Sequence, residues 1–409
     1  MLRWSVVLLL ADLGAGCEGN HAGASSTVSP RGSSVNGGGH IITTSRVSSS
    51  YNSSTNLPSL GSLRWILQKD IRVVRFIDSG RFSNVFEATL DQSLNSSWAQ
   101  HDGDSSVYWG SNTAPQSAIL KVLKHTFSGK VKREIRILES LKDVRGVVRL
   151  LGASKNSAVF PKTVGLLFEY LPDTQWLAHL HAPDSPSTAT ATATAAAANT
   201  TPRQAWTLAE IRFFFYKLLC ALAACHARGV MHRDVKPRNV VVQRRGTKQL
   251  RLIDFGLSEI YSPGARYNPS VASRHFKCPE LLVGYEHYDF GVDIWAAGCI
   301  LAGLIFHLEP FFFGSDTEDQ LAAIAAVVGS EALLGWAKRY KIKLPSSMRQ
   351  AIGRHADTPL RAFRNANNAH LCCDEALDLL GKMLCVDHVQ RATASECLAH
   401  AFFDSVRSS

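Results

Sequence analysis

The stretch that decides the fold reads HRDVKPRN at residues 232–239, and the triplet DFG follows at residues 254–256. Two short apolar runs lie between these motifs, Val240–Val242 directly after the first and Leu250–Ile253 directly before the second. Runs of this length and composition predict short β-strands. Two such strands can bring the outer ends of both motifs to one cleft, so we expect the motifs to form a single site.

The polar residues of the two motifs suit phosphoryl transfer. The Asp234 carboxylate can accept a hydroxyl proton. The Asp254 carboxylate and the Asn239 amide supply hard oxygens of the kind that hold magnesium. A base beside two metal ligands, at this spacing, indicates a site that moves a phosphoryl group from a magnesium-bound nucleotide to a hydroxyl group.

Length and composition point to more than one lobe. The chain has 409 residues, more than one hydrophobic core usually fills, and 45% of them are apolar. The formal net charge of +10 suits an acidic partner such as a nucleotide, an acidic protein segment, nucleic acid or an anionic membrane, and a solvated basic surface explains it about equally well. The nine cysteines lack the spacing of a metal site or a disulfide framework. We therefore expect reduced cysteines and a cytoplasmic or nuclear location.

The N-terminus suggests an alternative location. Arg3 precedes a short apolar run at Ser5–Ala11, and small residues follow at Ala15–Cys17, which together are typical of a weak signal peptide for the secretory pathway. Asp12 ends the run well short of the length that spans a bilayer. We expect no transmembrane segment anywhere, because no stretch reaches about 18 uncharged apolar residues.

Composition divides the chain into three parts. Residues 1–60 combine the hydrophobic N-terminus with a tail rich in Ser and Gly that we expect to be disordered. Residues 61–170 form the predicted small lobe, with a polar insertion at 91–117. Residues 171–404 form the predicted large lobe, with an insertion of Ala and Thr at 183–202 that has no amphipathic face.

Hydrophobic periodicity predicts strands in the small lobe and helices in the large lobe. The expected strands are 71–77, 85–90, 118–123 and 165–170, with a helix at 130–141. Thr207 and Glu210 form a capping box that opens a long helix ended by Gly229. Further helices are expected at 293–307, 317–328, 374–384 and 393–401. An antiparallel sheet with one main helix, followed by a mostly helical lobe, is an α+β fold.

Four longer motifs carry a resemblance to a known family. They are IDFGLSEIYSPG at 253–264, YNPSVASRHFKCPELLVGYEHYDFGVDIW at 267–295, EPFFFG at 309–314 and DHVQRATA at 387–394. With them the chain resembles the eukaryotic protein kinases, and from Trp65 to about Asp404 it is similar to the catalytic alpha subunits of casein kinase II. The resemblance implies a bilobal protein kinase fold and a serine/threonine kinase that uses Mg2+ and ATP, with GTP as a second donor. It also implies acidic protein substrates, a regulatory beta subunit as a candidate partner and no nucleic acid partner.

The resemblance assigns catalytic roles to single residues. Lys121 would bind the nucleotide phosphates, and Glu134 would pair with it. Asp234 would orient the acceptor hydroxyl and take its proton, while Lys236 would neutralise charge on the transferred group. The metal would be held by Asn239 and Asp254. We also expect a buried ion pair between Glu280 and Arg391, and we expect Asp293 to hold the backbone of the catalytic loop.

The resemblance also predicts the binding residues. Those expected at the nucleotide are Ile77, Asp78, Ser79, Gly80, Arg81, Phe82, Ser83, Asn84 and Val85 of the loop over the phosphates, with Ile119, Lys121, Glu169, Leu171 and Val241. Those expected at an acidic substrate are Arg274, Lys277 and Lys130.

Departures from the family pattern leave alternatives open. Asp78 stands where the phosphate loop has its first glycine, which predicts weaker ATP binding because a carboxylate repels phosphate. Ser270 replaces a basic residue and Phe127–Gly129 replaces a lysine run, so the preference for acid should hold directly after the target residue and weaken further downstream. Ser-rich sequence replaces part of the N-terminal segment that braces the family's activation segment, residues 254–280 here. A nucleotide-binding pseudokinase or scaffold, and a secreted kinase with different substrates, are the alternatives.

Overall fold

All of the described residues lie in one unit of the chain. The computed structural model describes residues 63–67, 70–80, 83–91, 116–124, 129–155, 163–172, 174–177 and 206–407. The chain divides into the units Met1–Thr43 and Thr44–Ser409, and every described residue belongs to the second. The expected tail at 1–60 with its signal-like segment, the insertion at 183–202 and nearly all of the insertion at 91–117 lie outside the described residues.

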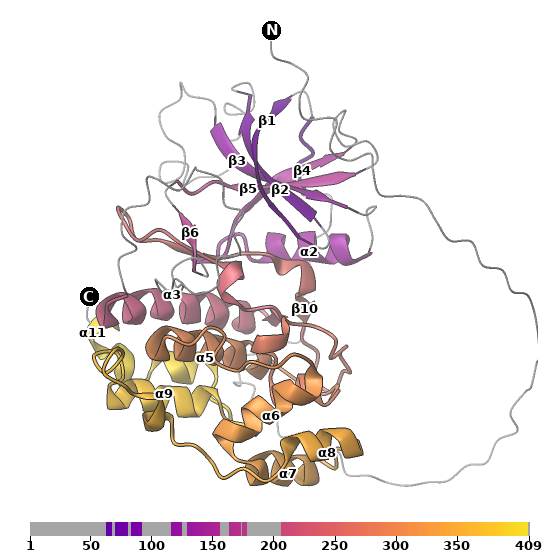
Figure 1. Ribbon diagram of the computed structural model, residues 1–409. Helices are drawn as coiled ribbons and strands as arrows, with labels where there is room; N and C mark the ends of the chain where they lie inside the picture. The colour runs from indigo at the N-terminus through magenta and orange to yellow at the C-terminus, as the bar shows by residue number, and fades with distance from the viewer. Residues whose placement is uncertain are drawn as a thin grey trace, which may run out of the picture. The chain divides into compact units, whose positions relative to one another are not determined.

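A five-stranded antiparallel sheet forms the small lobe, in the order β1-β2-β3-β5-β4 (Figure 1). The strands are β1 Ile71–Ser79, β2 Ser83–Leu90, β3 Gln116–Leu123, β4 Leu150–Lys155 and β5 Val164–Glu169. The main helix of the lobe is α2, Gly129–Ser140. The four predicted strands and the helix are confirmed. Strand β4 was not predicted, because its sequence LLGASK has neither alternating polarity nor β-branched residues.

The sheet has a buried layer on each face. Leu166 and Phe168 of β5 belong to the main core, which also contains Ile135 of α2. Leu167 lies between them in sequence and belongs to a second cluster, where Ile66 covers the opposite face. Successive side chains of a strand point to opposite faces, so β5 joins the two layers. The first layer holds α2 against the sheet, and α2 carries one of the expected site residues.

Helix α3, Leu208–Ala227, begins with the predicted capping box. The Thr207 hydroxyl accepts the N–H of Glu210 at 3.2 Å, and the Glu210 carboxylate accepts the N–H of Thr207 at 3.1 Å. The helix ends before Gly229, whose φ of +73° is left-handed and suits glycine. Its predicted apolar stripe is buried, at Ile211, Phe214, Phe215, Leu218 and Leu222.

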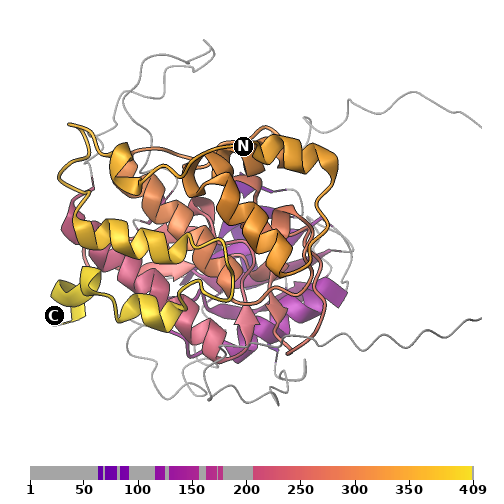
Figure 2. The ribbon, with the colours of Figure 1, turned by 90° about the horizontal axis from the view of Figure 1, so that it is seen from below.

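Helices α4 to α11 build the rest of the large lobe. Figure 2 shows that these helices, from the C-terminal part of the chain, lie together. Their bounds are α4 Pro279–Leu282, α5 Gly291–Phe306, α6 Thr317–Val328, α7 Ser330–Arg339, α8 Ser346–Ile352, α9 Asp374–Met383, α10 Ala394–Leu398 and α11 Asp404–Arg407. Helices α7 and α8 were not predicted. The helix predicted at 393–401 was too long, because His400 is extended and its ring caps the 3-10 helix Ala401–Phe403.

Pairs of short strands place the two sequence motifs. Strand β8, Val240–Val242, pairs with β9, Leu250–Leu252, as predicted, and also with β6, Gln175–Trp176. Strand β7, Val230–Met231, pairs with β10, Glu259–Ile260. Each pair has one strand beside the HRDVKPRN motif and one beside the DFG motif, so both motifs lie at the same end of these strands.

Two findings bear on the expectations from composition. All eight cysteines of the described residues are free, and five of them are buried. No single helix in the described ranges is both long and apolar enough to cross a membrane. The pair α6 and α7, bent by 109° where the two helices meet, passes that test of length and composition.

The predicted ion pair between Glu280 and Arg391 is confirmed and fully buried. The two nitrogens of the guanidinium lie 2.6 and 3.0 Å from the two carboxylate oxygens. Arg391 also donates to the carbonyls of Cys385 and Gly291, each at 2.9 Å, and lies over the Trp295 ring. Burial by itself raises the pKa of Glu280, but Arg391 outweighs it and the pKa falls below its ordinary value of 4.5. The pair therefore ties α4 to the start of α5 and to the loop before α10.

We predict that Arg391→Met lowers the free energy of unfolding by about 3–5 kcal/mol, because it leaves the Glu280 charge buried without a partner. Urea denaturation followed by circular dichroism measures this loss. Arg361→Met, on an exposed residue, is the control and should cost little. Since the folded pKa of Glu280 is lowered, the contribution of the pair is complete above pH 4.5 and declines as the pH falls further, so the two variants should converge in acid. Equal losses in the two variants at pH 7 would contradict the prediction.

Candidate active site

A buried carboxylate holds the loop that carries HRDVKPRN. Asp293, in the first turn of α5, accepts the N–H of His232 at 2.8 Å and the N–H of Arg233 at 2.7 Å. Its oxygen also lies 3.0 Å from Nε2 of His226. Arg233 has a left-handed backbone with a φ of +64°, a strained conformation for a residue with a side chain. The expectation that Asp293 holds this loop is confirmed.

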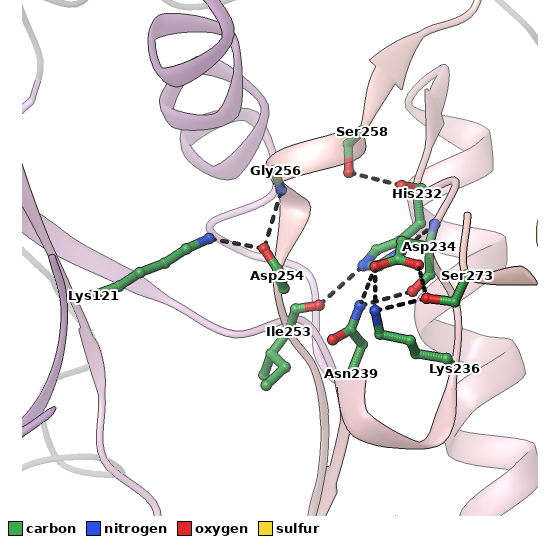
Figure 3. Close-up of polar contacts among 10 residues, drawn as sticks. All are labelled: Lys121, His232, Asp234, Lys236, Asn239, Ile253, Asp254, Gly256, Ser258 and Ser273. Atoms are coloured by element: carbon green, nitrogen blue, oxygen red, sulfur yellow. Dashed lines mark hydrogen bonds and ion pairs between the residues drawn. The ribbon is translucent and has the colours of Figure 1, made fainter. Parts of the chain in front are cut away.

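Three donors surround the Asp234 carboxylate (Figure 3). Lys236 Nζ and Asn239 Nδ2 donate to its Oδ2 at 2.8 and 3.0 Å, and the Ser273 hydroxyl donates to its Oδ1 at 3.0 Å. Lys236 also donates to the Ser273 hydroxyl at 2.9 Å. Asp234 is buried, and both of its carboxylate oxygens accept hydrogen bonds from these donors. The bonds hold the carboxylate in one orientation, which suits a catalytic base.

Ser273 is a site residue that the sequence did not reveal. It is one of four serines in the activation segment, residues 254–280, and no motif distinguishes it from the others. Its neighbour in sequence, Arg274, begins the 3-10 helix η7, Arg274–Phe276. The hydroxyl joins this part of the segment to Asp234 across 39 positions of sequence, and no spacing rule reports a contact of that range.

The ammonium group of Lys121 joins the two lobes. Its Nζ lies 2.7 Å from Oε1 of Glu134 on α2 and 2.8 Å from Oδ1 of Asp254 (Figure 3 draws the second contact). Burial lowers the pKa of Lys121, but Glu134 and Asp254 more than reverse the effect and raise it. Burial raises the pKa of Asp254, and Lys121 overrides it and lowers the pKa to about 2. Both groups are therefore charged at neutral pH.

The backbone at the DFG triplet fits this contact. Asp254 adopts a left-handed conformation with a φ of +61° and precedes the 3-10 helix η6, Phe255–Leu257. A Cβ atom on Gly256 would lie 3.2 Å from Asp254 Oδ1 and 3.6 Å from Glu134 Oε2. Glycine at this position leaves room for Asp254 and Glu134 to approach the same ammonium group.

The metal-ligand candidates keep oxygens available. Asn239 uses its amide nitrogen on Asp234, and Asp254 uses Oδ1 on Lys121 and on the N–H of Gly256. Among the described residues no hydrogen bond uses Asn239 Oδ1 or Asp254 Oδ2. Both are hard oxygens, so the pair fits Mg2+ and leaves its other ligand positions to phosphate and water.

The loop over the phosphates is closed by its own hydrogen bonds. The Asp78 carboxylate accepts the N–H of Ser79 at 2.8 Å, and the N–H of Gly80 donates to the Ser83 carbonyl at 2.9 Å. Lys124 Nζ donates to the Gly80 carbonyl at 2.7 Å. The N–H groups of Ser79 and Gly80 thus have partners within the loop. Arg81 and Phe82, at the tip, lie outside the described residues.

The apolar residues expected around the nucleotide come from separate elements of the fold. Ile119 on β3, Val241 on β8 and Leu171 after β5 are each half-buried. Glu169, at the end of β5, is different because its carboxylate is 2.8 Å from Nε of Arg251 on β9 and accepts the N–H of Arg149 at 3.0 Å. Its side chain therefore joins the small lobe to β9 and is not available to a nucleotide.

The candidate substrate residues fall into two groups. Arg274 begins η7 directly after Ser273, whose hydroxyl contacts Asp234, and Lys277 follows the end of η7. Arg274 donates to the Ser315 carbonyl, and burial lowers the pKa of Lys277. Lys130 is exposed in the first turn of α2, in the small lobe.

Glu259 is a second residue that sequence reasoning missed. Its carboxylate lies 2.5 Å from Arg133 on α2 and 3.4 Å from Nη2 of Arg233 in the catalytic loop. Arg133 lies one turn after Lys130 on α2, but its guanidinium is paired with a carboxylate of the chain itself. Arg133 is therefore not available to an acidic substrate at the start of α2.

A two-lobed α+β fold with these groups in one site defines a phosphotransferase. Residues 104–403 match the protein kinase domain family, which is nearly three quarters of the chain. The chain therefore belongs to the protein kinase family, and the predicted fold class is confirmed. Members of this family generally use ATP and Mg2+.

We predict that Glu134→Gln lowers kcat/KM for MgATP by roughly tenfold or more, because the loss of a charge-assisted hydrogen bond costs about 1.5–3 kcal/mol. Without this anion Lys121 loses one of its two anchors. Glu139→Gln, the same substitution on the same helix, is the matched control because Glu139 has no contact with Lys121. Initial rates at varied MgATP measure both. Equal losses in the two variants would rule out a special role for Glu134.

We predict that Asp78→Gly lowers the KM for ATP by about fivefold. Two unit charges about 4 Å apart repel by ~1 kcal/mol in water, or roughly fivefold in affinity, and the substitution also frees the Ser79 amide for phosphate. Asp78→Asn removes the charge but keeps an oxygen for that amide, so it should give a smaller decrease. A KM for ATP that stays the same in both variants would show that the carboxylate does not affect nucleotide binding.

Proposed function

We propose that this protein kinase is a serine/threonine kinase of the casein kinase II type, which transfers the γ-phosphoryl group of ATP to Ser or Thr in acidic sequence contexts. One observation carries the proposal: Lys121 Nζ lies within 2.8 Å of the carboxylates of both Glu134 and Asp254. The phosphate-binding cation, its helix partner and the candidate metal-binding carboxylate are thus assembled, and Lys121 and Asp254 are charged at neutral pH. The four motifs at 253–264, 267–295, 309–314 and 387–394 support the type.

Each polar group of the site has a task in this reaction. Bound MgATP supplies the phosphoryl group, and its metal neutralises charge on the phosphate oxygens. Asp234 orients the acceptor hydroxyl and takes its proton as the new bond to phosphorus forms. Lys236 Nζ, 2.8 Å from that carboxylate, places positive charge beside the transferred group. Asn239 and Asp254 would hold the metal through Oδ1 and Oδ2.

The proposed acceptor residue and the acidic residues expected around it are both inferred from the part of the activation segment near Asp234. The Ser273 hydroxyl is an aliphatic alcohol 3.0 Å from Asp234, which supports Ser or Thr as acceptors. Arg274 and Lys277 follow directly and would contact an acidic residue just after the target. The occupation of Arg133 by Glu259 favours a weaker preference further downstream.

Several further properties belong to the proposal. GTP would serve as a second donor, and a regulatory beta subunit would bind the small lobe. The location would be cytoplasmic or nuclear. Secretion is the alternative, and mass spectrometry of the mature protein tests it, because an intact N-terminus through Cys17 would exclude signal cleavage.

A nucleotide-binding scaffold is the second candidate function. The specific observation in its favour is the closed phosphate loop, in which Asp78 occupies the Ser79 amide. A scaffold, however, has no need for a carboxylate base held by three donors. Measurable nucleotide binding without any phosphate transfer would favour the scaffold.

We predict transfer from radiolabelled ATP to peptides that carry Ser or Thr followed by acidic residues. A peptide with Asp directly after the target should have a kcat/KM several-fold above one whose Asp lies three positions downstream, because Arg274 and Lys277 follow Ser273, whose hydroxyl contacts Asp234. Asp234→Asn removes the base and should lower kcat by at least a hundredfold. Phosphoamino acid analysis identifies the acceptor.

Arg274→Ala with Lys277→Ala should remove the preference at the first position, whereas Lys130→Ala should leave it unchanged. Selection that is stronger at the third position than at the first would refute the proposed recognition. Phosphotyrosine as the main product would refute the serine/threonine assignment.

A further inference from the structure

A shallow pocket lies in the large lobe, apart from the catalytic site. It has a volume of about 380 Å³ and lies between the segment Val283–His287, which joins α4 to α5, and the segment Tyr340–Lys343, which follows α7. Arg266 of the activation segment completes the lining. Figure 1 shows α7 at the end of the large lobe farthest from the sheet. None of the residues assigned to catalysis lines this pocket.

The rim of the pocket is basic. Lys341 and Lys343 are exposed, and neither side chain has an ion pair or hydrogen bond with any part of the chain that the structure describes. Arg266 is exposed as well, and Glu286 is the one carboxylate among the lining residues. Two unpaired cations and a third that is shared with one anion leave an excess of positive charge, which attracts anionic ligands.

The backbone holds Lys341 in a defined position. The N–H of Lys341 donates to the Lys338 carbonyl at 3.2 Å, and the N–H of Ile342 donates to the Ala337 carbonyl at 2.8 Å. These two bonds form the Schellman motif that ends α7, in which the residue at Lys341 is left-handed, here with a φ of +54°. Glycine is the usual residue at such a position, so a lysine carries strain there. The basic rim is thus attached to a capped helix end.

Aromatic rings form the wall below the lysines. The rings of Tyr285 and Tyr340 lie 6.3 Å apart, and both are half-buried. The Tyr340 hydroxyl donates to Asp387 at 2.8 Å, which fixes the ring in place. An apolar or aromatic side chain of a ligand can therefore pack against these two rings while its neighbours face the lysines.

The structure already contains one example of the contact that a ligand would make. The carboxylate of Glu286 accepts a hydrogen bond from Nε of Arg266 at 2.6 Å. A carboxylate from another chain can make similar contacts with Lys341 and Lys343. The pocket has room for a few side chains only, which suits a short peptide segment better than the continuous phosphate backbone of a nucleic acid.

We infer that this pocket binds an acidic peptide segment, with its carboxylates on Arg266, Lys341 and Lys343 and an apolar or aromatic side chain on Tyr285 and Tyr340. It is a second docking site for acidic chains, separate from the residues beside Asp234. That the segment comes from a protein substrate rests on the proposed function, whereas its acidic chemistry rests on the pocket alone.

The test measures binding without catalysis, so it does not depend on the proposed function. The probe is a fluorescent peptide of Asp residues around one Tyr, without Ser or Thr, and its anisotropy is followed with the full-length chain. Lys341→Glu with Lys343→Glu should weaken binding about tenfold. Glu286→Gln removes the one acid of the pocket and should tighten binding a few-fold.

Control variants separate the pocket from general charge and from misfolding. Arg361→Glu with Arg364→Glu changes the net charge equally on exposed residues outside the pocket and should alter binding less than twofold. Lys341→Gly relieves the left-handed strain while it removes a charge, so it should weaken binding at unchanged or higher thermal stability. A similar loss in the Arg361/Arg364 variant would overturn the proposal.

Further outcomes decide between sites and between ligands. Arg274→Ala with Lys277→Ala should leave a binding component that Lys341→Glu with Lys343→Glu removes, and complete loss in the first variant alone would overturn the inference. A single-stranded oligonucleotide and vesicles of anionic lipid serve as competing probes. If the lysine substitutions weakened either of these but left peptide binding unchanged, the pocket would not be a peptide site. Absence of kinase activity with retained peptide binding would refute the proposed function alone.

Discussion

The contact of one ammonium group with two carboxylates is the interaction on which the active site depends. Lys121 comes from β3, Glu134 from α2 and Asp254 from the start of the DFG triplet, so a single cation joins three elements from both lobes. Burial penalises each charge by itself. Together the charges stabilise one another, which keeps Lys121 protonated and lowers the pKa of Asp254 to about 2. The contact exists only when β3, α2 and the triplet are all in place, and this links the fold of the small lobe to the chemistry.

The same principle governs the buried charges further from the cleft. Asp293 is buried, and burial raises its pKa, but His226, His232 and the N–H groups of the catalytic loop more than compensate, so that its pKa is lowered. It therefore remains a carboxylate that holds two backbone N–H groups beside the strained Arg233. Asp234 follows directly in sequence, so the orientation of the base depends on a charge in α5. Removing such a buried charge affects folding and catalysis together.

Much of the fold and the central part of the site could be predicted from the sequence, because these features depend on local patterns. Periodicity located β1, β2, β3, β5 and α2, and the capping box located the start of α3. Asp234, Asn239 and Asp254 follow from short motifs of fixed spacing, whereas Lys121, Glu134 and Lys236 were assigned through the resemblance to the protein kinases. What could not be predicted depends on contacts between distant residues or on geometry without a pattern. Ser273 reaches Asp234 only because the activation segment folds back, and Glu259 reaches Arg133 across 126 positions.

Asp78 shows a further limit of prediction from residue type. Its identity predicts repulsion of phosphate, and the sequence leaves its orientation open. In the structure the carboxylate accepts the amide of the next residue, so its effect has two parts. The charge repels phosphate, and the hydrogen bond occupies a donor that phosphate would need. Only the second part depends on the backbone, and for that reason it could not be derived from the sequence.

The distribution of basic residues determines what a net charge of +10 means. Arg391, Arg251 and Arg233 are buried and bound to carboxylates, so they contribute to the count without attracting a partner. Lys341 and Lys343 are exposed and have no such anion among the described residues. Binding of an anionic partner therefore depends on where the unpaired cations lie more than on the total number of basic residues. The net charge alone is explained about equally well by an acidic partner and by a solvated basic surface. Whether each cation is paired with a carboxylate of the chain is the property that separates these two explanations.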